Sequence, residues 1–289
     1  MVKSLREIVK EAEDKKIAIG HFNISDTEGL WAIFNAAKNL GVPVVIGVSE
    51  GERDFIGTKQ VAALVRSIRE EFDYPIYLNA DHTYSYERVV EAIDAGFDSV
   101  IFDGTKLSME ENINMTRKCV EYAKNSGRDV LVEAEIGYIG SSSKILDEIP
   151  EGAEISDDKI VRPEDAKRFV EETGVDMIAP AVGNIHGMLR HASNPNLSIE
   201  RIREIREACG VPLVLHGGSG LTDENFVNAI DAGISTVHIN TEIRRAYRQG
   251  IQKYLSENPE EIAPYRFMKE GLRAMQDVVE NRLRLFNKI

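Results

Sequence analysis

Short apolar segments alternate with longer amphipathic segments along almost the whole chain. The apolar segments are rich in β-branched residues and are hydrophobic on both faces, as are parallel strands that helices cover; they lie at residues 17–24, 42–50, 75–83, 99–107, 129–137, 175–184, 212–220 and 236–242. The amphipathic segments carry apolar residues three and four positions apart, the spacing of a surface helix; they lie at 27–41, 58–72, 85–97, 109–127, 162–174, 197–210, 222–233 and from Ile243 to about Leu255. Eight strand and helix units in succession predict a (β/α)8 barrel.

Glycine ends most of the predicted helices. It tolerates the left-handed conformation that commonly ends a helix, so these positions are predicted C-terminal caps. They are Gly41, Gly96, Gly127, Gly174, Gly210 and Gly233. Two further amphipathic segments flank the repeats, at residues 1–16 and from Asn258 to Ile289, and we expect the second to pack on the barrel or on a partner subunit.

A doubly wound open sheet is the structural alternative for alternating strands and helices. That fold rarely uses eight consecutive units, and no GxGxxG motif follows the first predicted strand here. A chain of 289 residues is long enough to form one barrel. We therefore predict a single α/β domain over residues 1–289, a (β/α)8 TIM barrel with an extra C-terminal helix.

Histidine recurs directly after the apolar segments. Four of the six histidines lie there, at His82, His186, His216 and His238, and His21 follows the first segment in the same way. The carboxyl ends of all eight strands of such a barrel meet at one mouth. A single histidine in such a place is more often a hydrogen-bonded core or surface residue, whereas histidines from separate strand ends are what a catalytic zinc site requires. The recurrence therefore predicts a metal centre.

The same geometry brings other polar residues to the mouth. Together with the histidines they are Asn23, Ser49, Asp81, His82, Asp103, Glu133, Glu135, His186, His216, Gly217, Gly218, Ser219, His238, Asn240 and Thr241. Three histidines and a carboxylate such as Glu135 would make a zinc site with room for a substrate oxygen. Asp81 is the nearest carboxylate able to move a proton, provided that Asp81 and His82 both turn inward at the strand end. For Asp103, spacing alone allows a role in the site and a simple salt bridge with a lysine of the barrel equally well.

The sequence HGGSG at residues 216–220 is a second signal at the mouth. Its small residues let the backbone approach an anion, and the loop after the last strand adds Asn240 and Thr241. The loops after the seventh and eighth strands are the usual phosphate site of this architecture. A glycine-rich turn alone is weak evidence. Joined to a candidate metal histidine, it predicts a phosphorylated substrate next to a metal.

One connection is much longer than the others. Residues 137–161 follow the fifth predicted strand and are rich in Ser, Gly, Asp and Glu. A loop of this length in a compact domain is a lid or a plain insertion. We favour the lid, because the segment lies at the predicted mouth.

Composition narrows the classes of partner. The net charge is −13, which disfavours binding to nucleic acid or to an anionic membrane surface. No run approaches the roughly 18 apolar residues of a membrane span, and residues 1–16 lack the apolar stretch of a signal peptide, so we expect a cytoplasmic protein. Cys119 and Cys209 lie in predicted helices without a CxxC spacing, and we assign them no function.

Five motifs in this order resemble those of the class II, metal-dependent fructose-bisphosphate aldolases and the related tagatose-bisphosphate aldolases. They are LNADHT, FDGTKLS, VEAEIG, GNIHG and LVLHGGSG, and the resemblance runs from about Ile17 to the final helix. It implies that His82, His186 and His216 bind zinc and that Glu135 is an additional or alternate ligand. The resemblance also leaves open whether a second divalent cation or a monovalent cation binds. Asp81 would be the proton-transfer residue.

The resemblance assigns further roles around this centre. Asp103 would support a metal histidine from outside the coordination sphere. The cradle for the phosphate of dihydroxyacetone phosphate would consist of Gly187, Gly217, Gly218, Ser219, Asn240 and Thr241. Asn23 and Ser49 match positions at the other end of the substrate. A homodimer or homotetramer is expected.

The chain departs from the family pattern in three places. His238-Ile239-Asn240-Thr241 stands where Asn-x-Asp-Thr is usual, so a polar contact to the ketose is altered. Arg190 replaces a common lysine and is expected to meet a phosphate with a bidentate fork. Ser142 and Ser143 stand where many members carry acids, so a lid carboxylate must come from Glu148 or a neighbour. These changes bear on the identity of the sugar more than on the reaction.

The resemblance implies reversible cleavage of fructose 1,6-bisphosphate to dihydroxyacetone phosphate and glyceraldehyde 3-phosphate. Tagatose 1,6-bisphosphate or another ketose bisphosphate is the alternative substrate. A Schiff-base aldolase would need a lysine on the sixth strand, and MIAPAVGN at residues 177–184 has none. A metal-dependent hydrolase on this fold generally begins with HxH on the first strand, where GHFN offers one histidine. A non-catalytic sugar-phosphate binder would keep the cradle and lose an acid such as Asp81.

Overall fold

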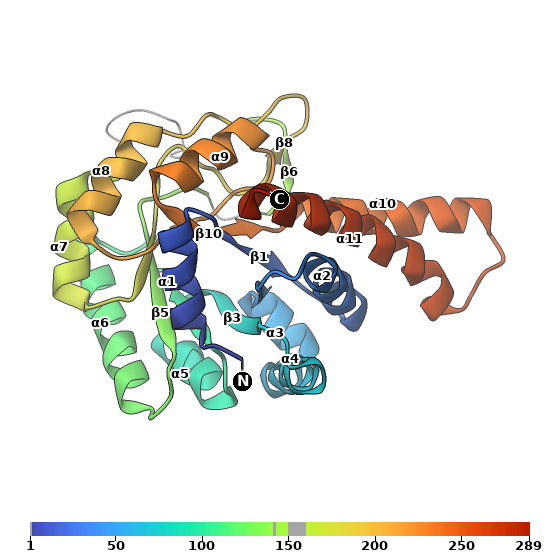
Figure 1. Ribbon diagram of the computed structural model, residues 1–289, viewed down its shortest axis with the longest axis horizontal. Helices are drawn as coiled ribbons and strands as arrows, with labels where there is room; N and C mark the ends of the chain where they lie inside the picture. Colours follow the sequence, from blue (N-terminus) through green and yellow to red (C-terminus); the bar gives the residue numbers. More distant parts are fainter. Residues whose placement is uncertain (1, 141–142, 150–159) are drawn as a thin grey trace.

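The computed structural model describes residues 2–140, 143–149 and 160–289. In this part of the chain, eight parallel strands close into a barrel in the order β1-β10-β9-β7-β5-β4-β3-β2 (Figure 1). Their bounds are β1 Ile19–Asn23, β2 Val44–Val48, β3 Ile76–Thr83, β4 Ser99–Phe102, β5 Leu131–Ile136, β7 Met177–Pro180, β9 Leu213–Leu215 and β10 Ile234–Ile239. The first and last strands pair in parallel, with Ile19 beside Thr236, which closes the cylinder. The predicted (β/α)8 barrel is confirmed.

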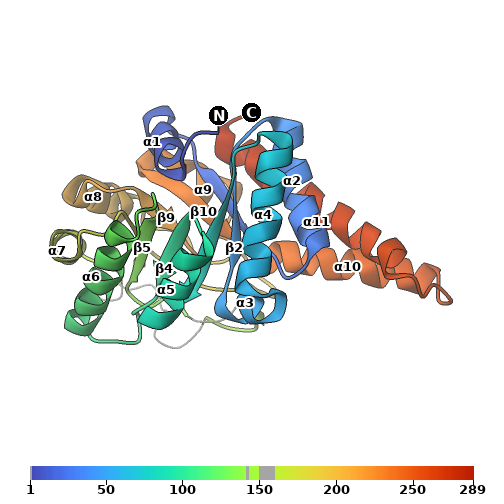
Figure 2. The same cartoon turned by 90° about the horizontal axis from the view of Figure 1, so that it is seen from below.

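Helices surround the barrel and connect its strands (Figures 1 and 2). Their bounds are α1 Leu5–Lys15, α2 Thr27–Leu40, α3 Glu50–Ile56, α4 Thr58–Phe72, α5 Tyr86–Ala95, α6 Met109–Asn125, α7 Pro163–Thr173, α8 Ile199–Cys209, α9 Asp223–Ala232, α10 Thr241–Glu257 and α11 Pro264–Asn287. The sequence pattern did not predict α3, because a helix of seven residues is too short to display a hydrophobic period.

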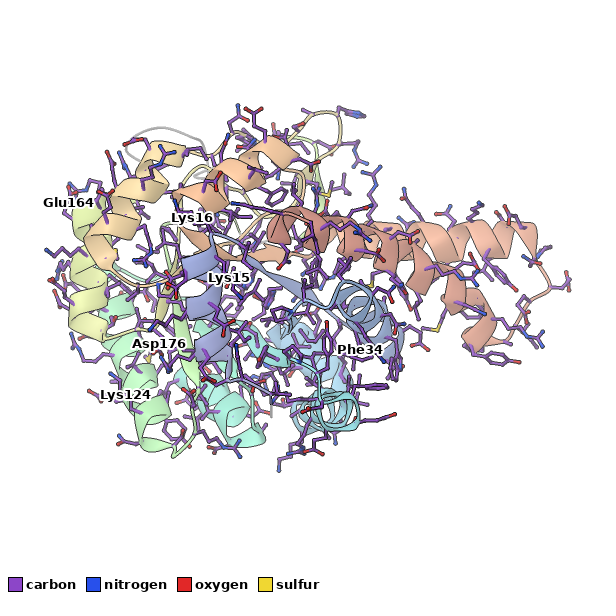
Figure 3. All side chains as sticks on the ribbon, in the orientation of Figure 1. Lys15, Lys16, Phe34, Lys124, Glu164 and Asp176 are labelled. Atoms are coloured by element: carbon purple, nitrogen blue, oxygen red, sulfur yellow. The ribbon has the colours of Figure 1, made fainter. Side chains whose placement is uncertain are left out.

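Apolar side chains between the strands and the surrounding helices form the main core. The strands β1, β2 and β5 are buried along their whole length, which explains why they read as apolar on both faces. A second, smaller core lies inside the barrel at the amino ends of the strands. There Leu5 and Val9 of α1 pack against Tyr77 and Met177, so α1 closes this end. Arg6 fixes the helix through an ion pair of 2.6 Å with Asp176, which Figure 3 labels beside α1.

Most of the predicted glycine caps adopt the expected conformation. Gly41, Gly96, Gly174 and Gly210 are left-handed at the ends of α2, α5, α7 and α8. Gly127 is also left-handed, at a φ of 73°, one position beyond the cap residue Ser126 of α6. One prediction differs in detail. Gly233 ends α9 at a φ of 125°, outside the left-handed helical region.

The last two helices form a hairpin that projects away from the barrel (Figures 1 and 2). One part of α11 returns to the barrel, where Leu283 and Phe286 are fully buried. Leu283 lies so close to β1 that a Cβ added at Gly20 would be 2.8 Å from its side chain. The extra C-terminal helix therefore packs on the barrel, although it begins at Pro264, later than the sequence predicted.

The long connection between β5 and α7 falls partly outside the described residues. Residues 141–142 and 150–159, which include Ser142, are not described, so the predicted lid over 137–161 stays a prediction. Within the described part, β6 (Ile145–Leu146) pairs in parallel with β8 (Met188–Leu189) beside the barrel. Among the helices of the described residues, none is long and apolar enough to cross a membrane.

Candidate metal centre and phosphate cradle

An irregularity at the end of β3 turns two neighbouring side chains into the barrel mouth. Ala80 pairs with Val100 and Thr83 with Phe102, so β3 has one residue more than β4 between these pairs. Such a bulge bends the strand and re-aims its side chains. His82 lies within it at a φ of 40°, a left-handed conformation that is strained for a residue with a Cβ. The bulge is the physical reason why neighbouring residues of one strand share a face.

A buried arginine supports this bulge from α3. Arg53 is 1% exposed, and its guanidinium donates to the backbone oxygen of Asp81 at 3.4 Å and to Thr83 Oγ1 at 3.1 Å. It also donates to the backbone oxygen of Val48 at 2.8 Å, which ties β2 to the end of β3. The sequence pattern offered no signal for Arg53, because the strand irregularity that it supports is itself invisible in the pattern.

Four of the predicted ligands converge at the mouth. They are His82, Glu135, His186 and His216, and one potential donor atom from each lies within 4.8 Å of the others. They come from β3, from β5, from the loop after β7 and from the end of β9. Contact between histidines from three separate strand ends is what the sequence predicted, and it depends on closure of the barrel.

Outer carboxylates orient two of these imidazole rings. Asp103 lies 2.9 Å from His82 Nδ1, and Glu133 lies 2.8 Å from His216 Nε2. Each contact fixes one ring nitrogen and directs the other nitrogen into the mouth, as carboxylates commonly do for metal-bound histidines. The structure thus places Asp103 behind a histidine and outside the four-residue cluster. Glu133, which the sequence placed at the mouth without a role, occupies the equivalent position behind His216.

The inward-facing atoms of this cluster have no hydrogen-bond partner. They are Glu135 Oε2, His186 Nε2 and His216 Nδ1, all fully buried. Buried polar atoms without partners are costly, and a cation would satisfy all three together. Three imidazoles and one carboxylate are also a usual donor set for catalytic zinc. The residues therefore fit a metal ion.

The electrostatics of the mouth also favour a bound cation. Burial lowers the pKa of His82, but the Asp81 carboxylate and the hydrogen bond with Asp103 outweigh it and raise this pKa to about 9. For His216, the hydrogen bond with Glu133 likewise overcomes burial and raises its pKa well above the ordinary value. Both shifts arise because buried carboxylates surround the rings. A bound cation would supply the positive charge that the protonated histidines otherwise provide.

Asp81 lies beside the cluster with one oxygen free. It is 4% exposed, and its Oδ2 accepts a hydrogen bond of 2.8 Å from Asn23. Its Oδ1 has no hydrogen-bond partner and lies 3.8 Å from His82 Nε2 and 3.5 Å from His238 Nδ1. Burial raises the pKa of Asp81, but the charge of His82 outweighs it and holds the pKa well below the ordinary value. The direction of this shift favours the ionised form of Asp81, which can accept a proton.

The predicted cradle lies in the same cavity as the cluster. The cavity is lined by Asn23, Asp81, His82, Ser143, His186, Gly187, Gly217, Gly218, Ser219, His238, Asn240 and Thr241. Gly217 has a φ of 62°, and a Cβ there would lie 2.3 Å from the backbone oxygen of Ile185. Ser219 Oγ accepts from the backbone nitrogen of Asn240 at 3.2 Å, which joins the loops after β9 and β10. Glycine is thus required for a close approach of backbone at this place.

Arg190 and Ser49 lie outside this cavity, whereas His238 lines it and contacts a second histidine. Arg190 does not line this cavity; it forms an ion pair of 2.7 Å with Asp147, so the prediction that it meets the cradle phosphate is not supported. Ser49 lines the outer part of the mouth. His238 stacks on His21 with ring centroids 3.5 Å apart.

The cavity, the histidine cluster and the ionised carboxylate at the carboxyl ends of a parallel barrel define a metal-dependent barrel enzyme. The sequence model of the class II fructose-bisphosphate aldolases matches residues 3–289. The chain therefore belongs to the class II fructose-bisphosphate aldolase family, whose members are metal-dependent carbon–carbon lyases.

Individual relatives agree with this assignment. A fructose-bisphosphate aldolase of Geobacillus stearothermophilus is 36% identical, over 98% of this chain and 96% of that protein. A 6-phospho-5-dehydro-2-deoxy-D-gluconate aldolase of Bacillus licheniformis is 35% identical, over 98% and 94%. The crystal structure of the YdjI aldolase from Escherichia coli K12 has a TM-score of 0.83 at 29% identity, over 99% of this chain and 97% of that one.

Metal binding should strengthen as the pH rises. His82 is protonated below its pKa of about 9 in the metal-free protein, and a histidine must lose its proton to bind a metal. We expect the affinity for Zn²⁺ to fall as the pH drops from about 9 to about 6, with release of roughly one to two protons per ion at pH 7. Titration calorimetry in buffers of different ionisation enthalpy measures both quantities. His191→Ala, at an exposed loop histidine, is the control, and an affinity independent of pH would contradict the assignment.

Proposed function

We propose that this protein catalyses the reversible aldol cleavage of fructose 1,6-bisphosphate to dihydroxyacetone phosphate and glyceraldehyde 3-phosphate, with Zn²⁺ as its metal. The observation that carries the proposal is the position of Asp81. Asp81 lines the same cavity as His82, His186 and the glycines of the cradle, and its Oδ1 has no hydrogen-bond partner. Tagatose 1,6-bisphosphate remains the alternative substrate. We also expect a cytoplasmic enzyme that forms a homodimer or homotetramer.

His82, His186 and His216 would hold the metal, with Glu135 as an additional ligand. The bound ion would polarise a carbonyl group and stabilise the negative charge that develops on its oxygen. We assign no second ion to the neighbouring group of His21, Asp81 and His238. The rings of His21 and His238 are parallel within 5°, so their nitrogen lone pairs lie in parallel planes and do not converge.

Asp81 would move the proton of the reaction. Asn23 holds one carboxylate oxygen, and the other is free to take the proton from the C4 hydroxyl during cleavage and to return it during condensation. The low pKa of Asp81 keeps the group in its accepting form before the substrate binds.

The cradle would hold the phosphate of dihydroxyacetone phosphate and fix the substrate. Asn194 stabilises it from behind, because its amide donates to the backbone oxygens of Gly187 and Ser219, each at 2.8 Å. A rigid cradle supplies orientation, which lowers the barrier without taking part in bond breaking.

The overall proposal is tested by removal of the metal. A chelator should abolish cleavage and Zn²⁺ should restore it, in coupled assays of fructose and tagatose 1,6-bisphosphates. Borohydride added with substrate should leave no covalent adduct, because β7 contains no lysine. Cleavage that survives thorough metal removal would refute the metal-dependent mechanism.

Ser219→Leu should weaken phosphate binding, because its side chain would fill the cradle and separate the loops that Ser219 joins. Loss of charge-assisted hydrogen bonds to the phosphate should raise the KM about tenfold or more. Arg203→Ala is the matched control. Its exposed pair with Glu200 on α8 lies outside the cavities of the mouth, and we expect a change of no more than about twofold. Unchanged affinity for dihydroxyacetone phosphate in Ser219→Leu would place the anion elsewhere.

The variant Asp81→Asn should distinguish the role of Asp81 in proton transfer from the role of His82 in metal binding. The variant keeps its three histidines, so its zinc content should stay at about one per chain, while cleavage falls by roughly 10²- to 10⁴-fold. His82→Ala should lose metal and activity together. Exchange of the C1 proton of dihydroxyacetone phosphate does not involve the C4 hydroxyl, so Asp81→Asn should retain more exchange than cleavage. Near-normal cleavage would remove Asp81 from the mechanism.

A further inference from the structure

A buried carboxylate on α3 binds several polar groups of the mouth. Glu52 is 6% exposed, and its Oε2 accepts from Asn23 Nδ2 at 2.9 Å, from the Ser49 backbone nitrogen at 2.7 Å and from Ser49 Oγ at 2.9 Å. Its Oε1 forms an ion pair with Arg244 of α10. Neither the sequence pattern nor the family motifs assigned Glu52 or Arg244 a role.

Ser49 and Arg244 line a part of the mouth that adjoins the cradle cavity, whereas Asn23 lines the cradle cavity itself. Two adjoining cavities share Asp81, His82 and His186. The first continues into the glycine cradle, whereas the second is lined by Ser49, Tyr84 and Arg244. In the proposed reaction one end of the ketose occupies the cradle. Its distal end, which leaves as the aldehyde, therefore meets the second cavity.

Glu52 occupies several hydrogen-bond donors of the two cavities. Asn23 directs its amide donors to Glu52 and Asp81, and Ser49 donates both its N–H and its hydroxyl to Glu52. One guanidinium nitrogen of Arg244 is engaged in the ion pair. The lone pairs of Asn23 Oδ1 and Ser49 Oγ remain as acceptors. An ionised phosphate needs donors, whereas a sugar hydroxyl can donate to an acceptor.

A purely local role explains only part of this arrangement. Ser49 and Glu52 form a capping box at the start of α3, which accounts for the bonds to Ser49. A capping box does not require the bond to Asn23 or the ion pair with Arg244, which is 192 residues away in the sequence. The Glu52 carboxylate therefore links α3 to β1, through Asn23, and to α10, through Arg244.

We propose that Glu52 is a specificity-determining residue that weakens the hold on a distal phosphate, so that the aldolase accepts ketose 1-phosphates with an uncharged, hydroxyl-bearing distal end beside the bisphosphate. The distal phosphate of a bisphosphate would compete with Glu52 for Arg244 and Ser49. The inference rests on the proposed aldolase function and deepens it. Family membership leaves the distal group open, since relatives of nearly equal identity carry the names of different substrates.

A neighbouring cavity offers the distal phosphate a different site. It is lined by Ser143, Ile145, Arg190, Thr241, Arg244, Arg245, Arg248, Gln249 and Gln252. Arg245 and Arg248 are exposed there and form no ion pair with the residues that the structure describes. If a distal phosphate bound these arginines, Glu52 would not control its binding. The experiment below separates the two sites.

The test compares fructose 1,6-bisphosphate with fructose 1-phosphate, which differ only in the distal phosphate. In Glu52→Gln, the amide oxygen can still accept from Ser49 and Asn23, while the amide nitrogen would face Arg244 and release it. With the zinc-loaded enzyme, the ratio of kcat/KM for the bisphosphate to that for the monophosphate should rise about tenfold or more. Adding Arg244→Met to this variant should abolish the gain. Asp54→Asn removes an exposed carboxylate of the same helix and should leave the ratio unchanged.

Three outcomes would overturn the proposal. The first is an unchanged ratio in Glu52→Gln, including an equal loss on both substrates, which would indicate a structural role only. The second is a ratio that falls in Arg245→Gln/Arg248→Gln while Glu52→Gln has no effect, which would place the distal phosphate in the arginine cavity. The third is a large fall in the ratio for Arg244→Met alone, because Arg244 is expected to be held by Glu52 in the wild type. This third variant keeps the test decisive if Glu52→Gln fails to fold.

A wild-type enzyme inactive on both ketoses would refute the aldolase function itself, and the role of Glu52 would fall with it.

Discussion

Buried negative charge at the barrel mouth is the constraint on which the site depends. Asp81, Glu133 and Glu135 are almost fully buried, and their hydrogen-bond and ion-pair partners among the described side chains are histidine and asparagine. Carboxylates in a low-dielectric interior require compensating positive charge. In the metal-free chain, protonation of His82 and His216 supplies it. The same requirement makes the mouth a cation site, because a divalent ion can replace those protons and satisfy the buried atoms that lack partners.

The bulge in β3 places two of the charged groups next to each other at the mouth. An ordinary strand would direct Asp81 and His82 to opposite faces. The extra residue and the positive φ of His82 bring both to one side, and Arg53 stabilises the bent backbone through buried hydrogen bonds. Backbone strain of this kind persists only where the surroundings impose it. The candidate proton acceptor and a candidate metal ligand are therefore held side by side by one piece of strained backbone.

The two ends of the cavity differ in hydrogen-bonding character. Around Gly217 and Ser219 the backbone comes close enough to surround an anion, and the loops after β9 and β10 are joined there. In the adjoining cavity, Glu52 occupies the donors of Ser49 and pairs with Arg244. This asymmetry would give a phosphorylated ketose one preferred orientation across Asp81. It also suggests how barrels of one family come to accept different sugars, since residues beside the chemistry can change while the metal cluster stays.

Local sequence patterns determined much of this protein. Apolar periodicity predicted the eight strands and their main helices, and small residues after the seventh strand predicted the cradle, because both signals arise from neighbours along the chain. The convergence of His82, His186 and His216 followed once the barrel was inferred, since parallel strands end at one rim. Tertiary structure alone decided which imidazole nitrogens face inward, that Arg190 turns to Asp147, and that Glu52 meets Arg244. Those outcomes depend on a strand bulge and on contacts between distant segments, which carry no periodic signature in the sequence.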